Sequence, residues 1–112
     1  MPVLLALLMA LVLLLPLAVV AQGRLPGCPG PFQSATWTNC IGTHTFPNGA
    51  TYDGDFLAGQ LNGYGTLAFT DGSKYVREVR NGRRNGLGIE YSADGKVLQS
   101  GIWENNLFVR RQ

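Results

Sequence analysis

Side chains suited to catalysis or metal binding are scarce in this chain of 112 residues. It has one histidine, His44, two cysteines, Cys28 and Cys40, and seven acidic residues. Two thiols and one imidazole without Cys-x-x-Cys spacing are too few for a zinc site. A lone histidine on a strand is most often structural, and the acids fall mainly at turns or on polar strand positions. The sequence therefore predicts no enzyme, no metal and no cofactor.

Charge is absent from residues 1–21, which are apolar and rich in leucine. The small residues Val19 and Ala21 before Gln22 fit cleavage of a signal peptide after Ala21. The alternative is an uncleaved anchor, because about 20 apolar residues can span a bilayer. Both interpretations predict an exported protein, periplasmic or extracellular, and the second attaches it to the membrane through residues 1–21.

Residues 22–40 contain three prolines and three glycines between Gly23 and Pro31, which argues against a helix or a central strand. We expect an irregular cap. Cys28 and Cys40 stand twelve positions apart, and in an oxidising compartment this pair is expected to form a disulfide. The alternative is lipid attachment at Cys28, because Leu25–Cys28 loosely resembles a lipobox.

A short phrase recurs at a step of 23 residues, in Asn39–Gly42, Asn62–Gly65 and Asn85–Gly88. The same step relates Phe46 to Phe69, Tyr52 to Tyr75, Gly59 to Gly82, and the turn pairs Asn48-Gly49, Asp71-Gly72 and Asp94-Gly95. Asx-Gly pairs between alternating segments predict tight hairpin turns. Looser connections are expected at 59–63 and 82–86. The chain is therefore a repeat of hairpins.

No stretch after residue 22 has a helical period, so residues 41–112 are predicted to be all-β, an antiparallel meander of six or seven strands in a single elongated twisted sheet. Alternation puts Tyr52, Gly54 and Phe56 on one face of their strand. The aromatic face predicted in this way consists of Phe46, Tyr52, Phe56, Phe69, Tyr75, Tyr91 and Trp103.

The third unit departs from the 23-residue step. Tyr91 follows Phe69 by 22 residues, and Trp103 follows Val79 by 24. These offsets predict a hairpin lengthened by two residues. Because an even insertion preserves the face of each side chain, Tyr91 is expected on the aromatic face.

The net charge of +2 is too small to indicate nucleic acid, but eight of the nine Lys and Arg residues lie at position 74 or later. Five of them form a candidate anion patch: Lys74, Arg77, Arg80, Arg83 and Arg84. The alternative is a solvated strand edge and loop. For Arg77, one interpretation stacks its guanidinium on Tyr75 and the other turns it toward a ligand.

The repeat resembles that of the MORN (membrane occupation and recognition nexus) family, most closely its small exported bacterial members. The family pattern is carried by Tyr52, Gly54 and Phe56, and less fully by Tyr75 and Trp103. The repeat glycines are Gly42, Gly49, Gly54, Gly59, Gly63, Gly65, Gly72, Gly82, Gly86, Gly88, Gly95 and Gly101. The resemblance implies a scaffold for protein association, in some accounts with contact to anionic lipid, and implies no catalysis.

We therefore expect a non-catalytic exported scaffold for protein association at the cell envelope. A single sheet buries its aromatic face only by curling on itself or by being covered. We expect an unknown partner, or a second copy, to dock through the aromatic face or an edge strand. The alternative function is binding of an anionic surface, such as phospholipid, lipopolysaccharide or an acidic glycan, through the basic stretch.

Overall fold

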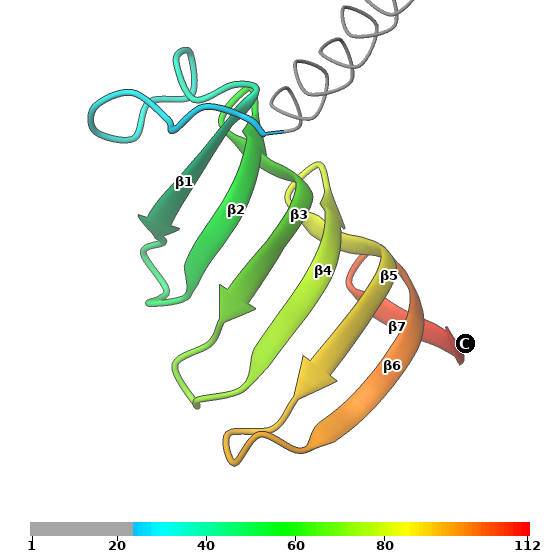
Figure 1. Ribbon diagram of the computed structural model, residues 1–112. Helices are drawn as coiled ribbons and strands as arrows, with labels where there is room; N and C mark the ends of the chain where they lie inside the picture. The colour runs from blue at the N-terminus through cyan, green and yellow to red at the C-terminus, as the bar shows by residue number, and fades with distance from the viewer. Residues whose placement is uncertain (1–23) are drawn as a thin grey trace, which may run out of the picture.

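The computed structural model of the chain describes residues 24–112, so the predicted signal segment lies outside the described residues. Seven strands form one antiparallel sheet in chain order (Figure 1). They are β1 (Cys40–Thr45), β2 (Thr51–Leu57), β3 (Gln60–Ala68), β4 (Lys74–Arg80), β5 (Arg83–Tyr91), β6 (Val97–Glu104) and β7 (Leu107–Arg111). The predicted all-β meander is confirmed. Residues 24–112 include no helix that is long and apolar enough to cross a membrane.

Two kinds of turn alternate along the sheet, and their roles differ from the prediction. The tight two-residue turns are Ala58-Gly59, Asn81-Gly82 and Asn105-Asn106, and both residues of each have positive φ. The predicted turn pairs Asn48-Gly49, Asp71-Gly72 and Asp94-Gly95 lie instead in longer loops, in which the three glycines have φ near 90°. A backbone that needs positive φ accepts Asn and Gly most readily, so both kinds of turn attract the same residues.

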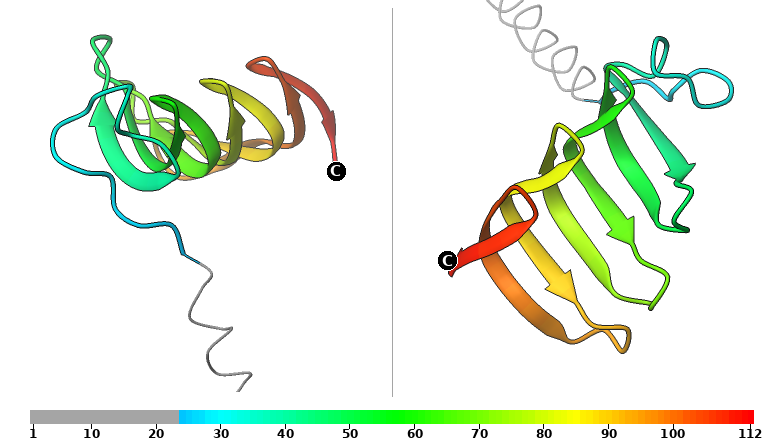
Figure 2. Two further views of the ribbon diagram at one scale, coloured as in Figure 1. Left: turned by 90° about the horizontal axis from the view of Figure 1, so that it is seen from above. Right: turned by 180° about the vertical axis from the view of Figure 1, so that it is seen from behind.

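The sheet is strongly curled, as its view from above shows (Figure 2). We call the face on the inside of this curl the inner face and the opposite one the outer face. The inner face carries the core of the described residues: Trp37, Cys40, Tyr52, Phe56, Leu61, Leu67, Tyr75, Val79 and Trp103. Curling thus buries an aromatic row within one copy of the chain, so no second layer is needed to cover it.

The register of the third unit corrects the sequence prediction. Ser92, not Tyr91, takes the place of Phe69, because the Ser92 N–H donates to the Lys96 carbonyl just as Phe69 does to Ser73. Tyr91 pairs with Lys74, whereas Glu90 pairs with Tyr75. Paired residues share a face, so Tyr91 lies on the outer face.

The insertion in the third unit is one residue rather than two. Glu90 pairs with Gln99 and Tyr91 with Val97, which leaves Leu98 as the extra residue of a β-bulge. Because the bulge absorbs the odd residue, Trp103 returns to the inner face. The predicted match of Tyr91 to Phe69 was wrong by one position, and a shift of one position reverses the face.

Candidate functional site

The repeated tyrosines hold pairs of strands together from within. Tyr52 lies across Gly65, where a Cβ atom would collide with the ring. Its hydroxyl donates to the carbonyl oxygens of Asp55 (3.0 Å) and Tyr64 (3.2 Å). Gly54 pairs with Gly65 beneath the same hydroxyl. The Tyr-x-Gly pattern is therefore a packing unit, in which absent side chains leave room for a ring.

The second unit repeats this arrangement. Tyr75 lies across Gly88, and its hydroxyl donates to the Glu78 carbonyl at 2.5 Å. Burial, with a further contribution from the Glu78 charge, raises the pKa of Tyr75 to about 12. Burial likewise raises the pKa of Tyr52, so both phenols stay protonated at neutral pH and keep donating.

Two acidic side chains of the repeat form structural hydrogen bonds to the backbone. The Asp55 carboxylate accepts a hydrogen bond from the Tyr64 N–H at 3.0 Å. The Glu78 carboxylate, 23 positions later, accepts from the Leu87 N–H in the same way. Each acid faces a glycine of positive φ, Gly63 or Gly86. These carboxylates stabilise the irregular strand backbone opposite them.

The repeated asparagine links neighbouring hairpins. The Asn62 side-chain oxygen accepts from the Asn81 N–H at 3.3 Å, and the Asn85 side-chain oxygen accepts from the Asn105 N–H at 2.9 Å. Each asparagine thus binds the turn that begins the next hairpin. The asparagine that begins the recurring phrase, Asn62 or Asn85, therefore has a structural role as well.

Most of the predicted aromatic face is not available to a partner. Tyr52 and Tyr75 are 0% exposed, Phe56 1% and Trp103 2%. Phe46 and Phe69 are partly buried and pack against this core, and Tyr91 is on the opposite face. The docking expected through the aromatic face is therefore excluded for its four buried rings, because the curl of the sheet already covers them.

The predicted anion patch does not form one surface. Lys74 and Arg80 stand at opposite ends of the seven-residue β4, roughly 20 Å apart at the usual rise of a strand. Arg80 and Arg83 are exposed and pair across the Asn81-Gly82 turn. Arg84 points into the inner face. Arg80 and Arg83 lie together and are exposed, Arg77 is exposed within β4, and binding of an anion at the five residues stays a prediction.

Arg84 occupies a cluster of three rings. Its guanidinium carbon lies 4.9 Å from the centroid of Trp103, 5.8 Å from Phe69 and 5.9 Å from Tyr75. It also approaches the Glu90 carboxylate at 3.7 Å. The cation that stacks on Tyr75 is therefore Arg84, and not Arg77 as one interpretation of the sequence had it.

Arg84 and Glu90 take the positions that Leu61 and Leu67 hold 23 residues earlier. Replacing Arg84 alone with leucine is expected to lower the free energy of unfolding by about 1 kcal/mol, because Glu90 loses its partner on a half-buried face. The double variant R84L/E90L restores the apolar pair of the first unit. We expect it to recover wild-type stability or exceed it, as measured by urea unfolding. An equal loss of unfolding free energy in the single and the double variant would contradict the coupling between Arg84 and Glu90.

Arg77 occupies a position at which the repeat has glycine, and its backbone adopts a strained conformation. Its φ is 125°, a conformation that glycine adopts readily and arginine does not. We expect Arg77→Gly to raise the free energy of unfolding by about 1 kcal/mol, since relief of strain exceeds the entropy lost by the added glycine. Arg77→Ala keeps the Cβ atom and is the matched control, with no gain expected. Thermal unfolding of both variants measures the difference in stability. An equal gain in stability for both variants would refute backbone strain at Arg77.

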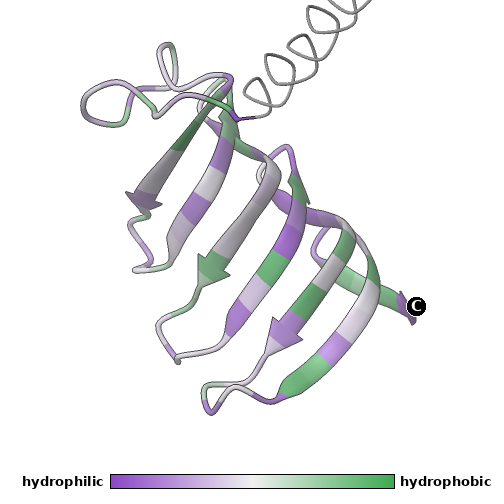
Figure 3. Ribbon diagram, viewed as in Figure 1, coloured by the Kyte–Doolittle hydropathy of each residue, from purple (hydrophilic) through white to green (hydrophobic). Residues whose placement is uncertain are grey.

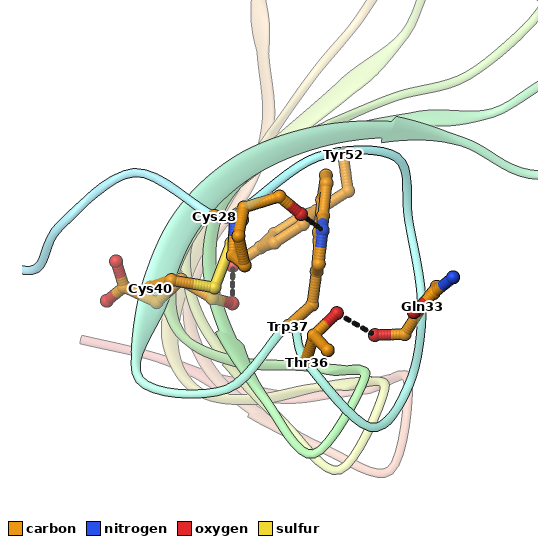
Figure 4. The surroundings of a disulfide bond; sticks show 8 residues. Cys28, Gln33, Thr36, Trp37, Cys40 and Tyr52 are labelled. Carbon is orange, nitrogen blue, oxygen red and sulfur yellow. Dashed lines mark hydrogen bonds between the residues drawn. A yellow bond between two sulfur atoms is a disulfide. The ribbon is translucent and has the colours of Figure 1, made fainter.

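The cap before β1 seals one end of the sheet. Cys28 and Cys40 form a disulfide, and the Cys28 N–H donates to the Ile41 carbonyl at 2.8 Å. Trp37 lies beside this bond inside the curl, and its Nε1 donates to the Pro29 carbonyl at 2.9 Å (Figure 4). Trp37 is 5% exposed. It occupies the space over Gly42, as Tyr52 does over Gly65.

Trp37 is a core residue that the repeat does not predict. Tyr52 and Gly65 are 13 residues apart, and so are Tyr75 and Gly88, whereas Trp37 and Gly42 are only five apart. No repeat step relates Trp37 to the tyrosines, so periodicity gave no signal for it. Its size and its place between the two cysteines were the only clues.

His44 lies in β1 and packs against the cap. Its ring stacks on Phe32 at 4.0 Å between centroids and meets Phe46 edge-on at 4.7 Å. Within residues 24–112 no three His, Cys, Asp or Glu side chains are grouped so that they could hold a metal ion. The geometry of His44 is that of a packed structural histidine.

The other end of the sheet is apolar and open. Val97 and Leu98 in β6, with Leu107 and Val109 in β7, are 45–71% exposed. The first part of β6 stands out as an apolar segment at this end of the sheet (Figure 3). Phe108 is the exception, because its ring packs against Trp103 at 5.4 Å. The two ends of the sheet are therefore unlike, one sealed and one exposed.

These features define a class of protein: a β-hairpin repeat whose recurring phrase is used for packing and turns. The model of the MORN repeat matches residues 52–74 and 78–97, which supports a MORN-repeat family for this chain. No curated protein matches it. MORN repeats are generally non-catalytic modules of protein or membrane association.

Proposed function

We propose that this chain is a small exported bacterial MORN-repeat protein, a non-catalytic scaffold that binds another protein at the cell envelope. One observation carries the proposal. The repeat residues pack in the core or form hydrogen bonds within the sheet, while one end of the sheet exposes apolar side chains. Exposed apolar surface gathered in one place is typical of interaction sites. The residues that recur with the repeat are engaged in internal contacts, which leaves association as the function best supported: Tyr52, Tyr75, Asp55, Glu78, Asn62 and Asn85.

Export is supported by the apolar segment 1–21 and by the disulfide of the cap. Disulfides persist in oxidising compartments and are rare where thiols are kept reduced. A bridge that joins the cap to β1 suits a small domain outside the cytoplasm. Fractionation of cells that carry a tagged chain, with protease added from outside, tests this part. Recovery in the cytoplasmic fraction would contradict it.

The association itself is tested by crosslinking with the folded protein as bait on a native envelope fraction. The expected result is one saturable crosslinked partner, lost when excess unlabelled protein competes. The Val97→Ser variant with Leu98→Ser is the control, because both side chains are exposed and their replacement changes the apolar end without removing a core ring. If wild type and this variant capture the same proteins equally well, the capture does not depend on the apolar end, and the scaffold function proposed for it is refuted.

A further inference from the structure

We propose that the space over Gly42 is a docking site for a tryptophan side chain of another protein, and that Trp37 keeps it closed until the Cys28–Cys40 disulfide is reduced. We call this space the Gly42 slot. Such a contact goes beyond the association function proposed above, because it lies at the capped end of the sheet and depends on the redox state of the cap.

The Gly42 slot belongs to a series that the repeat builds. The rings of Tyr52 and Tyr75 each lie across the glycine that stands 13 positions later in the chain. Thirteen positions before Gly42 stands Pro29, whose side chain has no aromatic ring. The repeat therefore forms the space over Gly42 without supplying the ring that fills it.

Trp37 fills the slot from the cap (Figure 4). A Cβ atom at Gly42 would lie 2.6 Å from the Trp37 ring. The same ring meets Phe56 edge-on at 5.0 Å between centroids and Phe32 edge-on at 5.3 Å. Edge-on contacts between aromatic rings are favourable beyond the area that they bury. The slot is thus shaped for an indole, because an indole is the ring that it holds.

The disulfide holds Trp37 in place. The Trp37 Nε1 donates to the Pro29 carbonyl at 2.9 Å, and Pro29 directly follows Cys28. The bridge joins Cys28 to Cys40, the first residue of β1. When the bridge is reduced, the loop between the two cysteines is no longer closed covalently. The loop-closure contribution of such a bridge corresponds to a rise of about 100-fold in the population with an open cap.

The reductant required is a dithiol, such as a protein with a Cys-x-x-Cys pair. Cys40 is 2% exposed and Cys28 is only partly buried, so a thiolate of the reductant attacks the Cys28 Sγ. The bond between the two sulfur atoms breaks, and Cys40 leaves as a thiolate that takes up a proton. The second thiol of the reductant then displaces Cys28 from the mixed disulfide. The protein gains two electrons and two protons, and the reductant becomes a disulfide.

The occupant that fits best is a strand of another protein. Trp37 precedes Cys40 by three residues, so after reduction it stays near its own slot at a high effective concentration. A second copy brings the same ring without that advantage. A partner strand adds contacts, because it can replace the cap segment in which Gly27 bridges Ile41 and the Pro26 carbonyl accepts from the Ile41 N–H at 2.8 Å. Strand addition combines such main-chain hydrogen bonds with a pocket for one side chain.

The probe for the slot is acetyl-Gln-Ser-Ala-Thr-Trp-Thr-amide, which copies residues 33–38. The host is the Trp37→Ala variant, so that the protein's own ring does not compete. Nuclear magnetic resonance titration is expected to shift the amides of Gly42 and Phe56 when the host is reduced with dithiothreitol. We expect the reduced host to bind the peptide about 100-fold more tightly than the oxidised host, in proportion to the population with an open cap. The same peptide with alanine in place of tryptophan is the control and should give no saturable shift.

Two glycine variants of the host separate the slot from the rest of the cap. Gly42→Ala should abolish binding of the peptide, because the added Cβ atom occupies the space of the ring. Gly27→Ala is the matched control, because a Cβ atom there meets no described atom within 4 Å. Amide protection in β3, β4 and β5 shows that each protein is folded. If the Trp37→Ala host loses this protection, reduced wild type replaces it, with a lower affinity because Trp37 competes.

Four results would overturn the proposal. They are equal affinities of the reduced and oxidised proteins for the peptide, binding that Gly42→Ala leaves unchanged, loss of the protection of β3–β5 when wild type is reduced, and shifts at Gly42 that grow with the concentration of reduced wild type alone. The last would assign the slot to the cap of a second copy. Failure of the peptide while the envelope crosslinking still finds a saturable partner would remove this slot and leave the association function standing.

Discussion

Replacing Tyr75 with alanine is expected to lower the free energy of unfolding by roughly 4 kcal/mol, the usual cost of removing a buried aromatic ring. Tyr75 is 0% exposed and contacts Trp103 edge-on at 5.2 Å. The substitution also removes the donor to the Glu78 carbonyl and one ring of the cluster around Arg84. Since small domains have total stabilities of 5–15 kcal/mol, roughly, much of the protein's stability depends on this one side chain.

Tyr64→Ala is the matched control, because Tyr64 follows the same repeat but is 60% exposed. Its loss should be below about 1 kcal/mol. Urea unfolding followed by tryptophan fluorescence measures both variants. Similar losses for Tyr64→Ala and Tyr75→Ala would contradict the assignment of Tyr75 to the core.

Removing the disulfide, by Cys28→Ser with Cys40→Ser, is expected to cost about 3 kcal/mol, the loop-closure value for a loop of about 15 residues. The bridge closes a sequence separation of 12 residues around Trp37. Without it, the cap is free to leave Gly42 and the end of the sheet. We expect the Trp37 signal to become solvent-exposed before the sheet unfolds.

Chemical reduction of the wild type provides the control for this second prediction. The reduced protein and the double serine variant should unfold at the same urea concentration, while oxidised wild type unfolds later. Trp103 lies at the other end of the core, so a Trp103→Phe background isolates the Trp37 fluorescence. A double serine variant as stable as the oxidised wild type would show that the disulfide of the cap does not contribute to stability.

The repeat made most of the fold predictable from the sequence. The 23-residue step and the alternation of apolar residues indicated an antiparallel meander, and the cysteine spacing indicated the bridge that the structure contains. Which turns are tight was not predictable, because Asn and Gly suit both kinds. The curl was left open as one of two ways to cover the aromatic face, since it depends on bulges that no single residue signals.

The candidate site was harder to predict, for physical reasons that differ by residue. Tyr91 was misplaced because a bulge at Leu98 absorbs an odd insertion that looked even in the sequence. Arg84 appeared to be one of five surface cations, although the 23-residue step already relates it to Leu61, because its charge outweighed its position in the repeat.

Amide hydrogen exchange, followed residue by residue in the oxidised protein, tests the central claim most directly: that the curled sheet buries its aromatic row within one copy of the chain. We expect the strongest protection in β3, β4 and β5, at every protein concentration. Protection of the Tyr52 and Tyr75 amides that appears only at high protein concentration would contradict the account.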